Sequence, residues 1–416
     1  MAPDATPLTP TFGSPLAAYR SDATARGASF GQDDGLWISV ATLVHHAATG
    51  EASRKSALLR DAIELTQEIV NDEALNVVGQ REWGDRDRCS CEPIMLLAKS
   101  VADAGAFRLA ASLLDSLLRA DSSLNAVQRG RILAQRARVA WLAGEIEEAR
   151  ARYAFVESLG RRARSPELKV RAWNGFAALA QMRGNFPDVR RYAARAARLA
   201  DRHDMPGLSR TAHYGLLVSA AADRRFDDAL VEGWKVYHLS IGDPIDEAGA
   251  LQNVGQVLFD AGHPAVAEIA FTAVCARALP ARILLPALGG LALATAAARH
   301  EATMEWAVRE VRAMRRTAAP RYAVTSAILD CARALDTTGR DAESRDCATE
   351  SLALAKRYGF HEIEIRAEAF LQEKKRGEQP SEPTRFTRRS ASVVRELSSM
   401  EPPRLPEHVH PTAAAV

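Results

Sequence analysis

Apolar side chains recur at spacings of three and four along most of the chain, as Val231, Trp234 and Tyr237 do. This spacing places them on one side of an α-helix, whereas a half-buried strand would alternate apolar and polar residues. No segment of the repeating region shows that alternation. The pattern therefore predicts an all-α protein.

The helical pattern is interrupted at a regular interval. The interrupting positions are Gly105, Gly144, Gly184, Arg224, Gly262, Arg299 and Gly339. They are separated by 39, 40, 40, 38, 37 and 40 residues. A fixed period of this length is typical of stacked helical repeats, and we expect each position to be the tight turn inside one helical hairpin.

Small residues stand at matched distances from these turns. The residues seven positions before them are Ala98, Ala137, Ala177, Leu217, Gly255, Ala292 and Ala332. The residues five positions after them are Ala110, Ala149, Val189, Ala229, Ala267, Met304 and Ser344. Because small side chains let two helix backbones approach closely, the pattern predicts that these positions form the contact inside each hairpin.

Prolines mark where the hairpins begin. They lie 18 or 19 residues before five of the turns, at positions 166, 206, 244, 280 and 320. Proline fits the first turn of a helix, where its missing N–H has no partner. Ser165 and Asp243 precede two of them and are predicted N-caps.

These positions resemble those of the tetratricopeptide repeat family. The matching residues include Trp173, Phe176, Ala177, Val189, Ala193 and Ala196. A second set is Leu251, Val254, Gly255, Ala267, Phe271 and Val274. The units are longer than the roughly 34 residues usual in that family, and in this they are similar to the helical arrays of bacterial transcription activators of the maltose-regulator type. The resemblance implies an α-α superhelix of seven or eight hairpins over residues 34–375, the first and weakest at 36–70.

The resemblance also implies a binding surface, because the first helix of each hairpin lines the concave side of such arrays. By register, the predicted groove residues are Arg131, Arg138, Trp141, Arg171, Asn174, Gln181, Tyr214, Gln252 and Gln256. Such side chains can hydrogen-bond a peptide backbone or a carboxylate and offer aromatic area. The function expected from them is that of an adaptor or scaffold that binds a protein or peptide, in a regulatory role in signalling or transcription. For any single position, a solvated groove surface is the alternative.

The middle of the chain is basic, with 20 Arg or Lys and 9 Asp or Glu between residues 129 and 225. An acidic protein partner is one interpretation, and a nucleic-acid-binding repeat is the alternative function. Much of the surplus falls on one second helix, at Arg190, Arg191, Arg195, Arg198 and Arg202. A solvated outer face is the favoured interpretation of that set, and the irregular residues at equivalent positions disfavour RNA readout. Nucleic acid is thus a less favoured partner than protein.

The chemistry of enzymes and cofactors has little support in this sequence. Neither Gly-rich nucleotide-binding motif occurs, and the segments that begin His300-Glu301 and His361-Glu362 lack a second histidine at zinc-protease spacing. The pair Cys89 and Cys91 has no second cysteine pair to complete a closed zinc site. We therefore expect no catalytic residues, no cofactor and no metal.

The two ends and one internal segment differ from the repeats. Residues 1–33 and 376–416 are rich in Pro, Ala, Thr or Ser without a period and are expected to be disordered. The second of these carries an apolar group at Val393, Val394 and Leu397, which could fold on a partner. Residues 71–92 form a charged, Gly-bearing insertion and a secondary candidate contact site.

The net charge of +2 is nearly balanced and requires neither nucleic acid nor an anionic membrane as partner. No export signal and no run of about 18 uninterrupted apolar residues is found. The cysteines are odd in number and scattered. A cytoplasmic protein without a membrane span is therefore expected, of undetermined oligomeric state.

Overall fold

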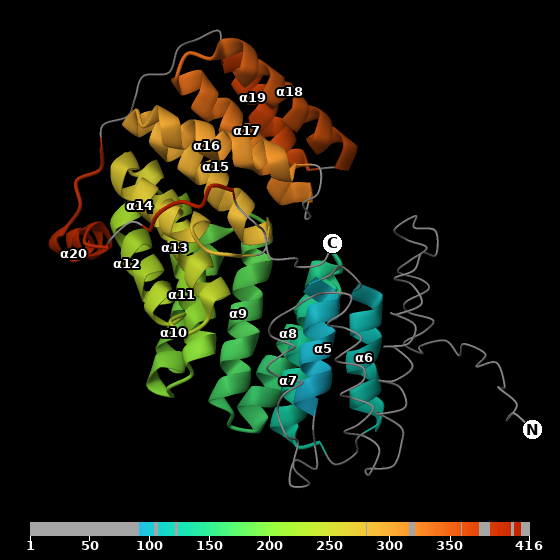
Figure 1. The fold of residues 1–416 in the computed structure, drawn as a ribbon. Helices are drawn as coiled ribbons and strands as arrows, with labels where there is room; N and C mark the ends of the chain where they lie inside the picture. Colours follow the sequence, from blue (N-terminus) through green and yellow to red (C-terminus); the bar gives the residue numbers. More distant parts are fainter. Residues whose placement is uncertain are drawn as a thin grey trace, which may run out of the picture. The chain divides into compact units, whose positions relative to one another are not determined.

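The computed structural model describes residues 91–103, 107–120, 124–279, 281–315, 321–358, 360–373, 383–400 and 403–408. These residues form sixteen helices, α5 to α20, and no strand (Figure 1). The all-α prediction is confirmed for this part of the chain. The leader 1–33, the expected hairpin 36–70 and most of the insertion 71–92 lie outside the described residues.

The chain divides into two compact units, which are described separately. The first contains residues up to Asn185 together with Arg198–Met205. Its helices are α5 (Cys91–Asp103), α6 (Phe107–Ala120), α7 (Ala126–Leu142), α8 (Ile146–Arg162) and α9 (Pro166–Met182). Helix α10 (Phe186–Arg202) contributes its last turn to this unit and the rest to the second.

The second unit contains Phe186–Ala197 and the residues from Pro206 onward. Its further helices are α11 (Pro206–Ala222), α12 (Phe226–His238), α13 (Pro244–Asp260), α14 (Pro264–Cys275), α15 (Ala281–Ala298), α16 (Glu301–Met314), α17 (Arg321–Thr337), α18 (Asp341–Tyr358), α19 (His361–Glu373) and α20 (Arg388–Ser398).

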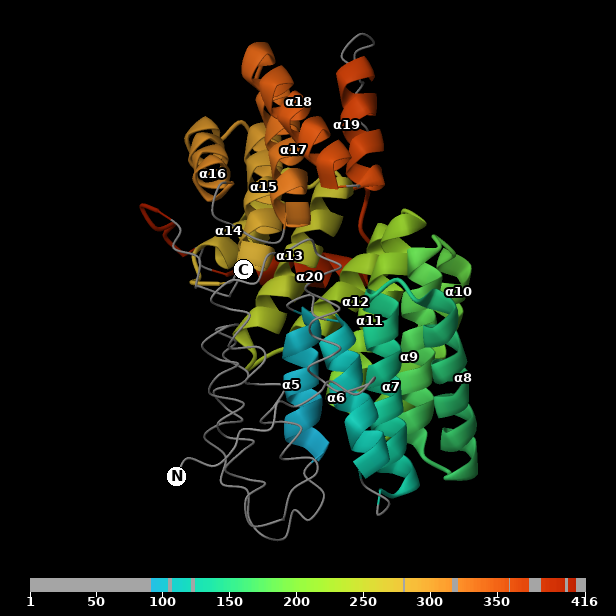
Figure 2. The ribbon, with the colours of Figure 1, turned by 90° about the vertical axis from the view of Figure 1, so that its right-hand side faces the viewer.

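Consecutive helices pack as hairpins, and each hairpin packs on the next (Figure 2). In the first unit α5 contacts α7 and α7 contacts α9, and in the second unit α13 contacts α15, α15 contacts α17 and α17 contacts α19. The first helices of successive hairpins therefore lie side by side within each unit. Such a row is what a stack of helical repeats produces.

The turns inside the hairpins lie where the spacing predicts them. Gly144, Gly184, Gly262 and Gly339 have positive φ angles between 65° and 85°. Arg224 and Arg299 occupy the equivalent turns with φ of 55° and 62°, although side chains other than glycine rarely adopt this conformation. The period of the repeat therefore identified these two turns when the residue type gave no signal. Gly105 lies outside the described residues.

The predicted helix starts are also confirmed. Helices α9, α11 and α13 begin at Pro166, Pro206 and Pro244. The Ser165 hydroxyl accepts a hydrogen bond from the Leu168 amide at 3.4 Å, and an Asp243 oxygen accepts from two amides at 3.2 and 3.1 Å. These caps satisfy N–H groups that a helix start leaves without partners. Pro280 and Pro320 lie outside the described residues, immediately before α15 and α17.

The small residues at matched positions are all buried. Ala98, Ala137, Ala292 and Ala332, before the turns, have no exposed surface, and neither do the seven residues five positions after the turns. Ala177 is 6% exposed. The prediction that small side chains form the contact inside each hairpin is consistent with this burial, because exposed positions would have excluded it.

Helix α15 lies at the centre of the second unit, where it contacts α13, α14, α16 and α17. Its length of 18 residues and mean hydropathy of 1.6 would also suit a membrane span. In the structure 72% of this segment is buried by other parts of the protein. A helix surrounded by others is apolar on all sides, which accounts for a composition that the sequence analysis passed over.

The C-terminal segment departs from the expectation of disorder over residues 383–400 and 403–408. Helix α20 packs on α12 and α14, with Val393 and Leu397 buried. Beyond it, the carbonyls of Pro406 and Glu407 accept hydrogen bonds from the Trp306 indole on α16, at 3.2 and 3.4 Å. The apolar group that we expected to fold on a partner is thus covered by this chain's own second helices. The remaining residues of 376–416 lie outside the described part.

Candidate functional site

The surface of interest is formed by the exposed and half-buried side chains of the first helices, here called the inner surface of each unit. In the first unit these side chains come from α5, α7 and α9. In the second unit they come from α11, α13, α15, α17 and α19. All nine residues predicted to line a groove are on these helices.

Arg131 and Arg171, two of the predicted residues, are joined by a carboxylate that the sequence analysis did not single out. Arg131 on α7 donates two hydrogen bonds of 2.7 Å to Glu167, which lies in the first turn of α9. Arg171, one turn later on α9, donates to the same carboxylate at 2.8 Å. Burial alone would raise the pKa of Glu167, but the two guanidinium groups hold the pKa below its usual value. The three side chains form a fixed polar bridge between neighbouring hairpins.

Replacing Glu167 with glutamine is expected to lower the free energy of unfolding by about 1 to 3 kcal/mol, because it leaves two arginines without their shared carboxylate. The contribution of the native carboxylate is present above its unfolded pKa of about 4.3 and is lost as the pH falls through its lower folded pKa. Urea unfolding at neutral and acidic pH measures both effects.

Glu147→Gln is the matched control, since Glu147 pairs with Arg183 of the next hairpin at 2.7 Å but has a side chain that is 78% exposed. A surface pair of this kind contributes about 1 kcal/mol or less. Equal losses for the two variants would show that the Glu167 bridge is not a stabilising element.

Two further contacts join inner residues one repeat apart. The indole nitrogen of Trp141, at the end of α7, donates to the Met182 sulfur at the end of α9. The Gln135 side chain on α7 donates to the Met95 carbonyl on α5. Together with the Glu167 bridge, these contacts fix the side chains of three successive first helices relative to one another.

The other predicted residues are present on the inner surface, in varied environments. Arg138, Asn174, Gln181 and Gln252 are half-buried. Tyr214 is 38% exposed, and Gln256 is exposed and donates to Asp260 at 2.9 Å. The first six predicted residues belong to the first unit and the last three to the second. Whether these residues contact a partner remains a proposal.

A charged group on the inner surface of the second unit was missed. Asp330 on α17 lies 3.6 Å from the Arg366 guanidinium on α19, and a Cβ added at Gly289 of α15 would be 3.1 Å from its carboxylate. Burial raises the pKa of Asp330 to about 6, against the opposing effect of Arg366 and Arg333 and with a further increase from Asp260. One signal was available, because Asp260 continues the series Gln252 and Gln256 by one helical turn.

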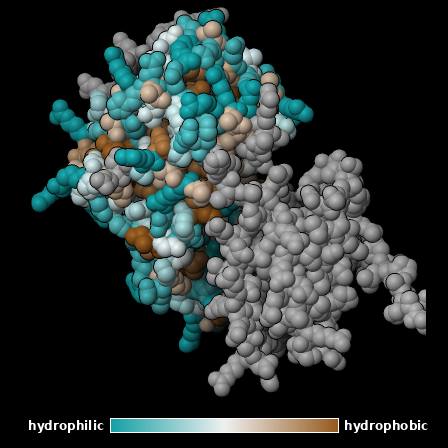
Figure 3. Space-filling view, in the orientation of Figure 1, coloured by the Kyte–Doolittle hydropathy of each residue, from teal (hydrophilic) through white to brown (hydrophobic). Residues whose placement is uncertain are grey.

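The basic set on α10 is solvent-exposed, as the sequence analysis favoured. Arg190, Arg191, Arg195, Arg198 and Arg202 are all exposed. Arg190 pairs with Asp223 at 3.5 Å and Arg191 with Asp188 at 3.0 Å. Hydrophilic residues also cover most of the described face seen in Figure 3, with hydrophobic residues in scattered patches. These arginines are typical of a solvated helix face.

The described residues contain no group of three or more His, Cys, Asp or Glu side chains that could hold a metal ion. Cys275, Cys331 and Cys347 are free and buried, and burial raises the pKa of the Cys275 and Cys331 thiols. Thiols kept protonated in this way are poor nucleophiles. Cys89 lies outside the described residues.

No protein-family model matches the chain, and no curated protein matches it. Among solved structures, it is similar to a signal transduction ATPase with numerous domains, a protein with a tetratricopeptide repeat sensor from Pyrococcus horikoshii. That match has a TM-score of 0.52 and 11% identity, and covers 86% of this chain and 55% of that chain. This chain thus spans about half the length of that protein.

Two other solved structures are similar at lower TM-scores. One is a Rap protein complexed with Competence and Sporulation Factor, with a TM-score of 0.42, 11% identity, and coverage of 88% of this chain and 99% of that one. The other is BtubC from P. vanneervenii, with a TM-score of 0.38, 19% identity, and coverage of 63% and 94%. The order of the helices, the burial of the small residues and the first similarity agree: the described part of the chain has the fold of a tetratricopeptide-repeat-like helical array.

Proposed function

We propose that this protein is a non-catalytic adaptor that binds a protein or peptide segment on the inner surface of its first helices. The observation that carries the proposal is the set of contacts between inner side chains one repeat apart, above all the bridge of Arg131, Glu167 and Arg171. A surface fixed in this way loses little conformational freedom when a ligand binds. Repeats of this fold commonly use such extended surfaces to bind other chains.

The chemistry of the inner surface suits a polypeptide ligand. Arg171, Gln256 and Tyr214 combine hydrogen-bonding groups with aromatic area, as residues at protein interfaces do. The same surface in the described residues brings together no nucleophile with an adjacent general base, which enzymatic chemistry would require. We therefore favour recognition over catalysis.

A regulatory role is the finer part of the proposal. The Pyrococcus horikoshii protein has repeats described as a sensor, and an array that recognises a segment of another protein can serve the same purpose here. An acidic segment is the favoured ligand for the first unit, because Arg131, Arg138 and Arg171 all lie on its inner surface.

The test uses random peptides displayed on phage, which require no knowledge of the natural partner. Peptides selected on the full-length protein are expected to bind Arg171→Glu at least about tenfold more weakly, since the substitution breaks the bridge and reverses a charge on the inner surface. Fluorescence polarisation measures the affinities, and circular dichroism checks that the helical content is unchanged.

Arg191→Glu is the control, because it makes the same charge change on the exposed face of α10. Peptides that bind both variants as tightly as the wild type would refute the inner surface as the binding site. So would binding that is lost equally in both variants on raising the salt concentration, which is expected of contacts with diffuse charge.

A further inference from the structure

Helix α20 contacts α12 at two separate points. At its start, the Thr387 amide donates to the Asp227 carboxylate at 2.8 Å, and the Ser390 hydroxyl donates to the same carboxylate. Near its end, the Trp234 indole donates to Glu396 at 3.0 Å. Asp227 and Trp234 are two helical turns apart on α12. The two helices are thus held together at both ends of a shared stretch.

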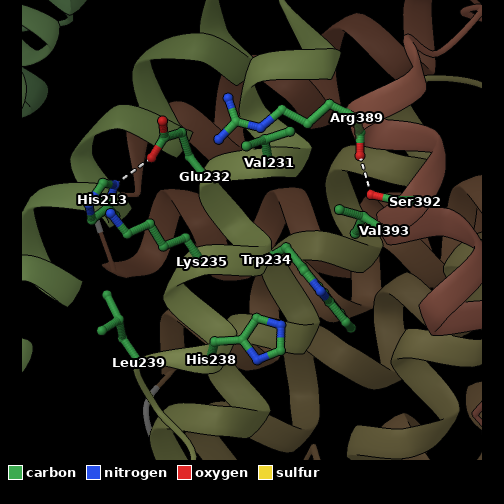
Figure 4. A pocket seen from close by; sticks show the side chains of 10 residues that line it. All are labelled: His213, Val231, Glu232, Trp234, Lys235, His238, Leu239, Arg389, Ser392 and Val393. Carbon is green, nitrogen blue, oxygen red and sulfur yellow. Dashed lines mark hydrogen bonds and ion pairs between the residues drawn. The ribbon is translucent and has the colours of Figure 1, made fainter.

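Between these two contacts the helices enclose a cavity of about 510 Å³ (Figure 4). Such a volume is in the range of small-molecule sites. Four apolar residues contribute to its wall: Val231, Trp234, Leu239 and Val393. Because the Trp234 indole nitrogen already donates to Glu396, the ring offers a ligand apolar surface rather than a hydrogen bond.

The charged groups of the cavity come from both helices. Lys235 lies on α12, and Arg389 extends from α20 across Val231 toward Glu232 (Figure 4). Glu232 is the one carboxylate among the lining residues, and its Oε2 lies 2.5 Å from Nδ1 of the buried His213. With the histidines neutral, the lining therefore has two positive charges and one negative charge.

We propose that this cavity binds a small organic anion that has one carboxylate and an apolar body. The carboxylate is placed at the end where Arg389 and Lys235 converge, since a guanidinium and an ammonium group both bind carboxylates through charge-assisted hydrogen bonds. The apolar body lies against Trp234 and Val393. This site is separate from the inner surface, so it stands or falls independently of the proposed function.

Occupancy of the cavity also acts on the C-terminal segment. Arg389, Ser392 and Val393 belong to α20, so a bound anion contacts α12 and α20 together. A ligand that binds only when α20 is docked stabilises the docked state by mass action. The anion is thus a small-molecule signal that holds the C-terminal segment on the second helices.

The experiment is isothermal titration calorimetry of the full-length protein with two probes, 2-naphthoate and octanoate, and with their uncharged alcohols. At least one carboxylate is expected to bind with sub-millimolar affinity and more tightly than its alcohol. The better probe distinguishes an aromatic from an aliphatic natural ligand. Amide hydrogen exchange in Arg388–Ser398 is expected to slow when that probe is added.

Arg389→Gln is expected to weaken binding of the carboxylate about tenfold or more. Arg388→Gln is the matched control, because this neighbouring arginine is exposed on the same helix and does not line the cavity. Three results would overturn the proposal: no binding of either carboxylate at millimolar concentration, equal affinity of Arg389→Gln and the wild type, or alcohols that bind as well as the acids.

Discussion

Replacing Gly290 with alanine is expected to lower the free energy of unfolding by about 1 to 3 kcal/mol. A Cβ at this position would lie 2.4 Å from Cζ of Phe271. The Phe271 ring is 1% exposed and also packs on Gly255, where a Cβ would be 3.0 Å away. The ring therefore has no space to move into, and α14 and α15 must separate. Urea unfolding monitored by circular dichroism measures the loss.

Gly249→Ala makes the same chemical change in α13, where an added Cβ would meet nothing within 4 Å. Alanine is favoured over glycine in a helix interior by about 0.5 to 1 kcal/mol. The two substitutions are thus expected to change stability in opposite directions. If Gly290→Ala were as stabilising as Gly249→Ala, close approach through small residues would not be what holds these hairpins together.

Replacing Asp330 with asparagine is expected to stabilise the protein by about 2 to 3 kcal/mol near pH 8. Burial raises the pKa of Asp330 to about 6, so ionisation of this carboxyl costs free energy in the folded state. That cost is absent below the unfolded pKa of about 3.9, increases as the pH rises toward 6 and then stays constant. Asparagine resembles the neutral acid and avoids the cost.

The difference between Asp330→Asn and the wild type is therefore expected to shrink as the pH falls from 8 to 4. Thermal unfolding across this range measures it, with the exposed Asp346→Asn as the control. A variant less stable than the wild type at pH 8 would mean that the ionised Asp330, paired with Arg366, is a net stabilising group.

The sequence was sufficient to predict the fold because the repeat is local and redundant. The turn at Arg224 could be placed from its neighbours forty residues away in either direction, and Pro166 and Ser165 gave the start of α9 without reference to tertiary contacts. Each hairpin repeats the same packing, so one degenerate position does little harm. The small residues before and after each turn then gave the register.

The inner surface could be predicted only in part. Register placed Arg131 and Arg171 on the same face, but the bridge between them depends on Glu167, whose role requires the distance between α7 and α9. Asp330 was missed for a similar reason, since its environment is created by α15 and α19. Pair contacts across hairpins are a tertiary property that the period of the sequence does not contain.

The C-terminal helix shows where the reasoning from composition fails. Residues 388–398 contain few apolar side chains, and an isolated helix of this length has marginal stability in water. Its order in the structure depends on Asp227 and Trp234 of α12, more than 150 residues earlier in the chain. A polar segment can thus be ordered by a few specific contacts that composition does not reveal.

Amide hydrogen exchange of the full-length protein, with and without a phage-selected peptide, locates the binding surface without any substitution. The peptide is expected to slow exchange in first helices, such as Ala126–Leu142 and Pro166–Met182, and to leave the second helix Ile146–Arg162 unchanged. Protection confined to second helices, with the first helices unaffected, would contradict the proposal that this array binds other chains on its inner surface.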